Sequence, residues 1–206
     1  MLCLSSRKGF ALGVIGSIIV ALPGSPASGQ NALQPASRTH FGIGFVGNAP
    51  DAIVGAAGYV VVPNMGGIGI YLDAKFDVDD PSDERGFDPG VTVDQVEAGG
   101  GDEVKSESSW WSVNAAFVRP VSPFLMIYGG AGYAHRKVYG LYNVDPAGEV
   151  GLGGVVWAES PGEEETRLNF MVGMMIRLTS RINTQFGFET QPQGLTVGVA
   201  LRLPPW

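Results

Sequence analysis

The sequence predicts an all-β fold, an eight-stranded antiparallel up-and-down barrel in one domain. First, apolar and polar residues alternate with a period of two along eight segments, and turn residues separate these segments. Second, 31 of the 206 residues are glycine, about twice the average share. Third, the links between the segments are mostly short, but two are long. Together these features favour a closed barrel over a helical or disordered chain.

The beginning of the chain resembles a secretory signal peptide. Arg7 and Lys8 precede 13 residues without a charge, Phe10–Leu22, and this run is shorter than the ~20 apolar residues of a membrane-spanning helix. The small residues that follow suit cleavage after Ala27 or after Gly29. We therefore expect three parts: a signal peptide at 1–29, a lead-in at 30–38 and the barrel at 39–206.

Charge and cysteine content exclude several classes of protein. The only cysteine, Cys3, lies in the expected signal peptide, so the mature chain has no disulfide and no cysteine metal ligand. The formal net charge of −7 becomes −9 when Arg7 and Lys8 are removed. Because nucleic-acid binding needs a basic surface, no nucleic-acid partner is expected. The mature chain also has no run of 18 apolar residues, so no transmembrane helix is expected.

Eight segments are expected to form strands, each pairing with the next. They are residues 39–47, 52–62, 67–78, 109–118, 124–138, 166–178, 181–190 and 195–203. The third segment places Ile70 and Leu72 on one face and Asp73 and Lys75 on the other. The sixth, seventh and eighth segments alternate in the same way. The second and fifth segments are apolar on both faces, so the sequence does not indicate which of their faces points into the lumen.

Glycine indicates which face of the barrel is inside. Six glycines share the polar face of their segments: Gly42, Gly44, Gly69, Gly173, Gly187 and Gly198. A strand surface in water gains nothing from glycine, whereas the narrow interior of an eight-stranded barrel needs small residues. The polar face is therefore expected to line the lumen and the apolar face to contact lipid. A soluble secreted barrel with an apolar ligand pocket is the alternative.

The links between segments are unequal in length. Two are long, 79–108 and 139–165, and if the first segment begins at the periplasmic side, both emerge on the outer side. Short periplasmic turns with longer extracellular loops are typical of outer-membrane barrels. The links therefore support a transmembrane barrel in the envelope of a Gram-negative bacterium.

Two stretches resemble a known family. Residues 123–133, Pro-Phe-Leu-Met-Ile-Tyr-Gly-Gly-Ala-Gly-Tyr, and the run 169–203, with its turn Leu-Thr-Ser-Arg, are similar to the small OmpA/OmpX-type outer-membrane barrels. The resemblance implies an outer-membrane location, contact with outer-membrane lipid and lipopolysaccharide, and insertion by the barrel-assembly machinery. Trp206 is similar to the family's terminal aromatic assembly signal, although Pro204 and Pro205 interrupt the alternation before it.

Acidic residues concentrate in the two long links. Residues 79–108 hold ten and residues 139–165 hold six of the 20 acidic residues. Three interpretations remain open: a solvated charged fringe, a site for a divalent cation, or a surface for a cationic partner. The candidate cation ligands are Asp77, Asp79, Asp80 and Asp83, although the spacing of an EF-hand is absent.

Seven charged residues are expected to point into the lumen: Asp73, Lys75, Asp77, Arg167, Arg177, Glu189 and Arg202. An unpaired charge in a narrow interior is costly, so we expect ion pairs between strands. These pairs predict a lumen filled with side chains. A narrow channel for small solutes is the functional alternative.

The chain has two histidines, and neither belongs to a recognisable catalytic motif. His40 lies at the beginning of the first segment, and His135 lies within possible reach of Ser106, Ser108 and Ser109. We therefore expect a structural or interaction protein of the outer membrane, with no enzyme activity and no cofactor. A lipid-modifying barrel enzyme with His135 in its site is a further, weaker alternative.

Overall fold

The computed structural model describes residues 39–49, 53–63, 67–84, 86–144 and 154–203. The chain divides into two compact units, Met1–Gln34 and Pro35–Trp206, and every described residue belongs to the second. The expected signal peptide and lead-in, and the terminal residues Pro204 to Trp206, lie outside the described residues. None of the helices in the described ranges is long and apolar enough to cross a membrane.

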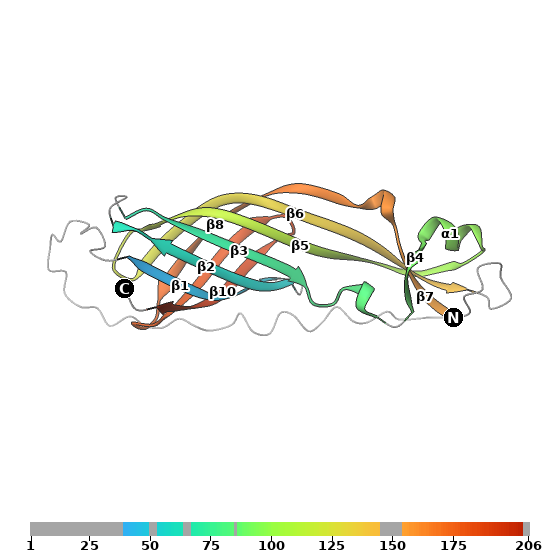
Figure 1. Cartoon of the computed structure of the whole chain (residues 1–206), viewed down its shortest axis with the longest axis horizontal. Coiled ribbons are helices and arrows are strands. Elements are labelled where there is room, and N and C mark those ends of the chain that lie inside the picture. Colours follow the sequence, from blue (N-terminus) through green and yellow to red (C-terminus); the bar gives the residue numbers. More distant parts are fainter. Residues whose placement is uncertain (1–38, 50–52, 64–66, 85, 145–153, 204–206) are drawn as a thin grey trace, which may run out of the picture. The chain divides into compact units, whose positions relative to one another are not determined.

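The all-β fold is confirmed. Eight strands pair in antiparallel fashion, each with the next, and the first also pairs with the last from Phe41↔Leu203 to Ala49↔Leu195. In the described part of the chain, the ladder of paired strands therefore returns on itself as a barrel wall (Figure 1). The wall consists of β1 (His40–Ala49), β2 (Ile53–Val61), β3 (Gly69–Asp77), β5 (Asp102–Pro120), β6 (Leu125–Val144), β8 (Glu165–Arg177), β9 (Ile182–Thr190) and β10 (Gln193–Leu203).

The polar face of the strands points inward, as the glycines predict. In β3, Ile70 and Leu72 are exposed on the outer surface, whereas Asp73 and Lys75 are buried in the interior. The structure also shows which face of β2 and which face of β6 points into the lumen, a question that the sequence leaves open. Tyr59 of β2 and Tyr128 of β6 are buried in the lumen.

Glycine allows the strands to approach closely inside the wall. A Cβ on Gly55 of β2 would lie 2.6 Å from the Cα of Lys75 on the neighbouring strand. On the outward face of the same strand, a Cβ on Gly58 would have its nearest neighbour at 3.5 Å. Crowding therefore falls on the inner face, where the lumen is filled.

Strands β5 and β6 extend beyond the barrel, which corrects the prediction of two long loops at 79–108 and 139–165. They remain paired as far as Asp102↔Asn143. Two short strands join them, β4 (Phe87–Thr92) and β7 (Gly154–Glu159). β7 pairs antiparallel with β6, and β4 pairs parallel with β7. We call β4, β7, residues 102–110 of β5 and residues 137–144 of β6 the outer sheet.

The outer sheet is covered on both faces by the link between β3 and β5. The helix α1 (Val93–Ala98) packs its buried Val96 on one face. The amide of Thr92 donates to the side chain of Gln95 at the start of α1, and Gly100, at a φ of +83°, follows its end. On the other face lies the short 3₁₀ helix η2 (Pro81–Asp83), while η3 (Pro161–Glu163) connects β7 to β8.

Candidate functional site: a filled lumen and an outer sheet

An ion-paired cluster crosses the lumen near the end of the barrel at which β3 and β9 finish. Lys75 Nζ lies 2.8 Å from Oδ1 of Asp73 and 2.5 Å from Oε1 of Glu189, and all three side chains are fully buried. Asp73 and Lys75 share a face because they are two residues apart on β3. Glu189 belongs to β9, which is four strands from β3 in either direction around the described wall. The pair of Lys75 and Glu189 therefore crosses the barrel.

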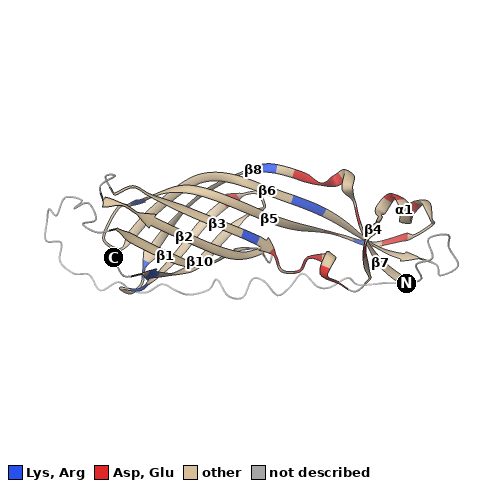
Figure 2. Ribbon diagram, in the orientation of Figure 1, with Lys and Arg blue, Asp and Glu red and all other residues tan. Residues whose placement is uncertain are grey.

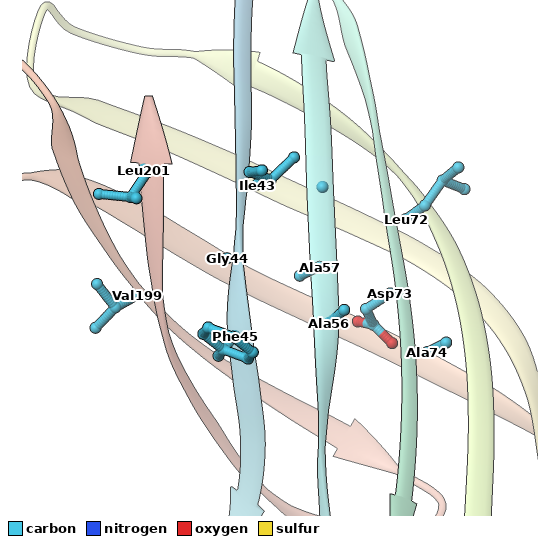
Figure 3. A pocket seen from close by; sticks show the side chains of 11 residues that line it. Ile43, Gly44, Phe45, Ala56, Ala57, Leu72, Asp73, Ala74, Val199 and Leu201 are labelled. Atoms are coloured by element: carbon cyan, nitrogen blue, oxygen red, sulfur yellow. The ribbon is translucent and has the colours of Figure 1, made fainter. Parts of the chain in front are cut away.

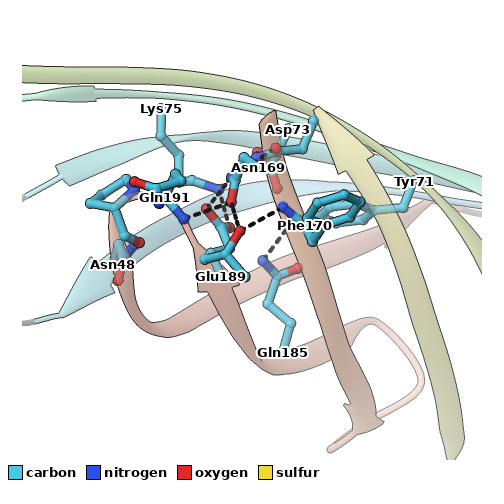
Figure 4. A network of polar contacts seen from close by, with 12 residues as sticks. Asn48, Tyr71, Asp73, Lys75, Asn169, Phe170, Gln185, Glu189 and Gln191 are labelled. Carbon is cyan, nitrogen blue, oxygen red and sulfur yellow. Dashed lines mark hydrogen bonds and ion pairs between the residues drawn. The ribbon is translucent and has the colours of Figure 1, made fainter. Parts of the chain in front are cut away.

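Two buried amides complete this cluster (Figure 4). Asn114 Nδ2 donates to Oδ1 of Asp73 at 2.8 Å. Asn169 Nδ2 donates to Oε2 of Glu189 at 3.0 Å and to Oδ1 of Asn114 at 2.9 Å. Two carboxylates thus share one ammonium group and two amide donors, an arrangement that compensates in part for the burial of charge.

Tyrosine side chains fill the lumen beside the ion-paired cluster. The rings of Tyr71 and Tyr128 stack with their centroids 4.9 Å apart. Gln185 Nε2 donates to the hydroxyl oxygen of Tyr71 at 3.0 Å, and Asn183 Nδ2 donates to that of Tyr59 at 2.5 Å. The interior of the barrel is therefore occupied by packed and hydrogen-bonded side chains.

Four of the seven charged residues expected in the lumen do not join the ion-paired cluster. Asp77 lies at the outer end of β3 and accepts a hydrogen bond from the amide of Asp79. Arg167 pairs with Glu165 of its own strand, and about half of its side chain is exposed. Our expectation of a pair between strands is therefore wrong for Arg167, because β8 reaches the outer rim there. Arg177 and Arg202 lie at the opposite end of the barrel, where β8 and β10 finish.

The four aspartates considered for a divalent cation are not gathered into one group of ligands. Within the described ranges, no group of three or more potential ligand side chains is suitably placed. Asp80 accepts hydrogen bonds from the hydroxyl of Ser109 at 2.6 Å and from the amide of Ser82 at 2.8 Å. Burial alone would raise the pKa of Asp80, but these hydrogen bonds outweigh burial and lower it. The Asp80 carboxylate therefore holds the link between β3 and β5 against β5, through its hydrogen bond with Ser109.

His135 has partners other than the serines considered with it. Its Nδ1 lies 2.9 Å from Oγ1 of Thr166, and its ring is 5.5 Å from that of Trp111. Ser108 accepts a hydrogen bond from Nε of Arg136, and Ser109 donates to Asp80. The described contacts of His135 thus include no serine hydroxyl.

One face of the outer sheet has its own apolar core. Val96 of α1 packs there with four residues of the sheet, Tyr142, Val144, Val156 and Ala158. The hydroxyl of Tyr142 donates to Oε1 of Glu97 at 2.9 Å. Burial, together with the carboxylate of Glu97, raises the pKa of Tyr142. A cluster of this kind gives the outer sheet stability of its own.

The opposite face of the outer sheet is organised around Trp157, which is buried. Its Nε1 donates to Oε2 of Glu84 at 2.9 Å. The ammonium group of Lys105 lies 4.8 Å from the centre of the indole ring, within range of a cation–π interaction. Phe87 meets Tyr139 edge to face at 5.8 Å. Trp157 therefore ties the link between β3 and β5 to β7.

The surface of the outer sheet is acidic, and the opposite end of the barrel is basic (Figure 2). Exposed carboxylates include those of Asp94, Glu97, Asp102 and Glu103. The sequence predicts the acidic character of this region but not its folded sheet. The runs Val91-Thr92-Val93 and Val155-Val156-Trp157 are the signal that could have indicated a small core there.

Comparison with known proteins adds similarities of fold only. No protein-family model matches the sequence, and no curated protein matches it. Among solved structures, Ail, the attachment invasion locus protein of Yersinia pestis, is 15% identical with a TM-score of 0.43, covering 81% of this chain and 98% of that chain. A major outer membrane protein from Thermus thermophilus is 15% identical at a TM-score of 0.40, covering 82% and 100%. The N-terminal β-barrel domain of Pseudomonas aeruginosa OprF is 12% identical at a TM-score of 0.38, covering 81% and 98%.

Proposed function

We propose that this chain is an integral outer-membrane protein with a structural and interaction role, whose barrel holds the acidic outer sheet at the cell surface. One observation carries the proposal: the wall exposes large apolar side chains around a charged, filled interior. Phe45 is 81% exposed and Phe117 is 72% exposed. A contiguous apolar surface of this kind is not stable in water, whereas it suits the hydrocarbon region of a bilayer.

A groove on the outer wall supports contact with lipid. Small residues of β2 and β3, among them Ala56 and Ala74, lie beside the larger Phe45 and Leu72 (Figure 3). The groove has a volume of about 700 Å³. Its lining is almost entirely apolar, so alkyl chains of membrane lipid fit it better than water.

The arrangement of the connections supports the proposed orientation. Both links that build the outer sheet leave the barrel at one end, which is the end at which β3 finishes. At the other end, β5 and β6 are joined by residues 121–124 and β8 and β9 by residues 178–181. Because outer-membrane barrels have short periplasmic turns, we place the outer sheet outside the cell and the basic end in the periplasm. This proposal includes insertion by the barrel-assembly machinery.

The acidic outer sheet is proposed as the interaction surface. Its exposed carboxylates suit lipopolysaccharide bridged by divalent cations, or a cationic surface partner. The role is non-catalytic. The contacts of His135 with Thr166 and Trp111 support this assignment.

Membrane insertion is tested by charging the outer wall. We expect wild-type protein in the outer-membrane fraction, with an electrophoretic mobility in detergent that changes on boiling. Phe45→Lys should prevent this folded form, since a lysine near the middle of the bilayer costs about 2–4 kcal/mol. Val104→Lys is the matched control, because Val104 is 60% exposed but lies on the outer sheet. Folded, water-soluble Phe45→Lys protein would contradict the proposal.

The filled lumen is tested by single-channel recording in planar bilayers. We expect no steady conductance from wild-type protein, because the Lys75 cluster and the tyrosines occupy the lumen. Replacing Tyr71 and Tyr128 together with alanine should produce measurable openings. Stable openings of the wild-type protein would instead favour the narrow channel for small solutes.

A further inference from the structure

Three basic residues lie together at the end of the barrel opposite the outer sheet. His40 begins β1, Arg202 is at the end of β10, and Arg177 ends β8. Nη2 of Arg202 contacts Nδ1 of His40 and lies 3.1 Å from its Nε2. Arg177 is the register partner of Asn183, which is in turn the partner of Ala200, two residues from Arg202. We call His40, Arg177 and Arg202 the basic mouth.

All three side chains of the basic mouth belong to the lumen face of their strands. Arg202 is in phase with the buried Ala200, and Arg177 is in phase with the buried Met175. His40 is in phase with Gly42, whose inner side lies against the ring of Tyr59. The basic groups therefore border the interior of the barrel and not its lipid-facing wall.

Tyr59 and Asn183 close the basic mouth toward the middle of the lumen. Both are buried. The hydroxyl oxygen of Tyr59 accepts a hydrogen bond from Asn183 Nδ2, a bond that does not use the hydroxyl hydrogen. Asn183, the donor to Tyr59, is also the register partner of Arg177. The basic mouth therefore places a neutral hydroxyl group next to its cations.

No carboxylate balances these cations in the described part of this end. Residues 61–63, 67–69, 119–125, 177–182 and 201–203 contain four arginines and neither aspartate nor glutamate. Arg177 and Arg202 lie on the two strands that flank β9, so their positive charges border the same end of the lumen as His40. Like charges held together at the edge of a low-dielectric interior are unfavourable unless an anion joins them. The lumen cluster is different, because Lys75 there has two carboxylate partners.

We propose that the basic mouth binds a phosphate group. Guanidinium groups bind phosphate oxygens through paired N–H donors, and here two of them belong to different strands. The hydroxyl of Tyr59 supplies a third donor from above. A tetrahedral phosphate accepts hydrogen bonds from three directions, which a planar carboxylate does less well. The phosphate belongs either to the headgroup of an anionic phospholipid or to a free phosphate ion, and only the lipid case rests on the proposed membrane location.

Calorimetric titration of the purified barrel in an uncharged detergent tests this site. At constant ionic strength, the protein is titrated with inorganic phosphate and, separately, with short-chain dihexanoyl phosphatidylglycerol. We expect saturable one-to-one binding of at least one of them, weakened tenfold or more by Arg177→Gln or Arg202→Gln. Binding of inorganic phosphate identifies the free ion as sufficient. Binding of phosphatidylglycerol alone identifies the lipid headgroup.

Two controls separate a built site from general attraction to a basic surface. Arg119→Gln removes an exposed arginine at the same end, on the outward face of β5, and should leave binding unchanged. Dihexanoyl phosphatidylcholine, which has no net charge, should not bind in an arginine-dependent way. The proposal is overturned if neither phosphate ligand binds saturably, or if Arg119→Gln weakens binding as much as Arg177→Gln does.

A measurement on the wild-type protein tests the site even if the variants fail to fold. The side-chain ¹H–¹⁵N resonances of Arg177 and Arg202 should shift on addition of the phosphate ligand, while those of Arg119 should not. Unchanged Arg177 and Arg202 resonances at saturating ligand would also overturn the proposal. The boiling test of membrane insertion is independent of these measurements, so failure of the phosphate site and failure of the proposed function are distinguishable.

Discussion

Lys75 Nζ lies 2.5 Å from Oε1 of Glu189, although 114 residues separate the two in the chain and their strands face one another across the lumen. Neither side chain is accessible to solvent. Such a pair costs desolvation energy when it forms, and it leaves a buried charge without a partner when one member is removed. The pair therefore links opposite walls of the barrel more than it adds to net stability.

Lys75→Met is expected to lower the free energy of unfolding by about 3–5 kcal/mol, because Asp73 and Glu189 would remain buried without their shared cation. Urea unfolding in detergent micelles measures this loss. Adding Glu189→Gln to Lys75→Met should restore part of it. Lys105→Met is the control: the Lys105 side chain is 44% exposed, and its loss should cost no more than about 1 kcal/mol. Equal losses at Lys75 and Lys105 would contradict the assignment of a buried cluster.

Two glycines of β2 give a matched test of crowding in the lumen. Gly55→Ala points a methyl group inward, toward the backbone of Ala74 and Lys75, and should lower the free energy of unfolding by about 1–3 kcal/mol. Gly58→Ala points its methyl group outward, where the nearest atom is 3.5 Å away. It should be neutral or stabilise by up to about 1 kcal/mol. The opposite order in urea unfolding would reverse our assignment of the inner face of β2.

The barrel wall could be predicted from the sequence because lipid and lumen impose opposite demands on neighbouring residues. Ile70 and Leu72 alternate with Asp73 and Lys75 for this reason, and the glycines identify the inner face. The strands β2 and β6 could not be phased from the sequence. Both of their faces carry small or apolar residues, since β2 and β6 place tyrosine rings as well as glycines in the lumen.

The outer sheet could not be predicted in the same way. Beyond the membrane, β5 and β6 have no lipid-facing side, so the apolar alternation that identifies a strand disappears. Their pairing up to Asp102↔Asn143 is decided by backbone hydrogen bonds and by α1 packing on one face. The two partners of Lys75 were among the residues expected in the lumen. The ion pairs themselves could not be predicted, because they depend on the register of eight strands. Arg167 shows this, because its position at the rim gives it Glu165 as a partner.

The carboxylate of Asp80 predicts how the outer sheet responds to acid. The pKa of Asp80 is lowered in the folded protein, so its contribution to stability is complete above its ordinary pKa, about 3.9, and is lost as the pH falls through the lower folded value. Asp80→Asn should therefore increase amide hydrogen exchange at Ser82 near neutral pH, and this difference from wild type should shrink below about pH 4. A difference that is constant from pH 7 to pH 2 would contradict the role of the charged form.

Trp157 predicts that the outer sheet can be loosened while the barrel stays intact. Trp157→Ala removes a buried indole, a change that costs about 3–5 kcal/mol in a packed site. Because Trp157 contacts Glu84 and Lys105 and not the lumen, proteolysis of the outer sheet should accelerate, while the temperature of the electrophoretic shift on heating should stay unchanged.

Two further variants define what Trp157 contributes. Trp157→Phe keeps an aromatic ring but loses the hydrogen bond to Glu84, which is worth about 1.5–3 kcal/mol for a charged acceptor, and should give an intermediate rate of proteolysis. Val155→Ala is the control, since Val155 lies on the same strand and is 57% exposed. If Trp157→Ala lowered the heating shift of the barrel as much as it accelerated proteolysis, the outer sheet and the barrel would be one cooperative unit. Faster proteolysis with an unchanged heating shift would mean that the outer sheet can unfold while the barrel that holds it stays folded.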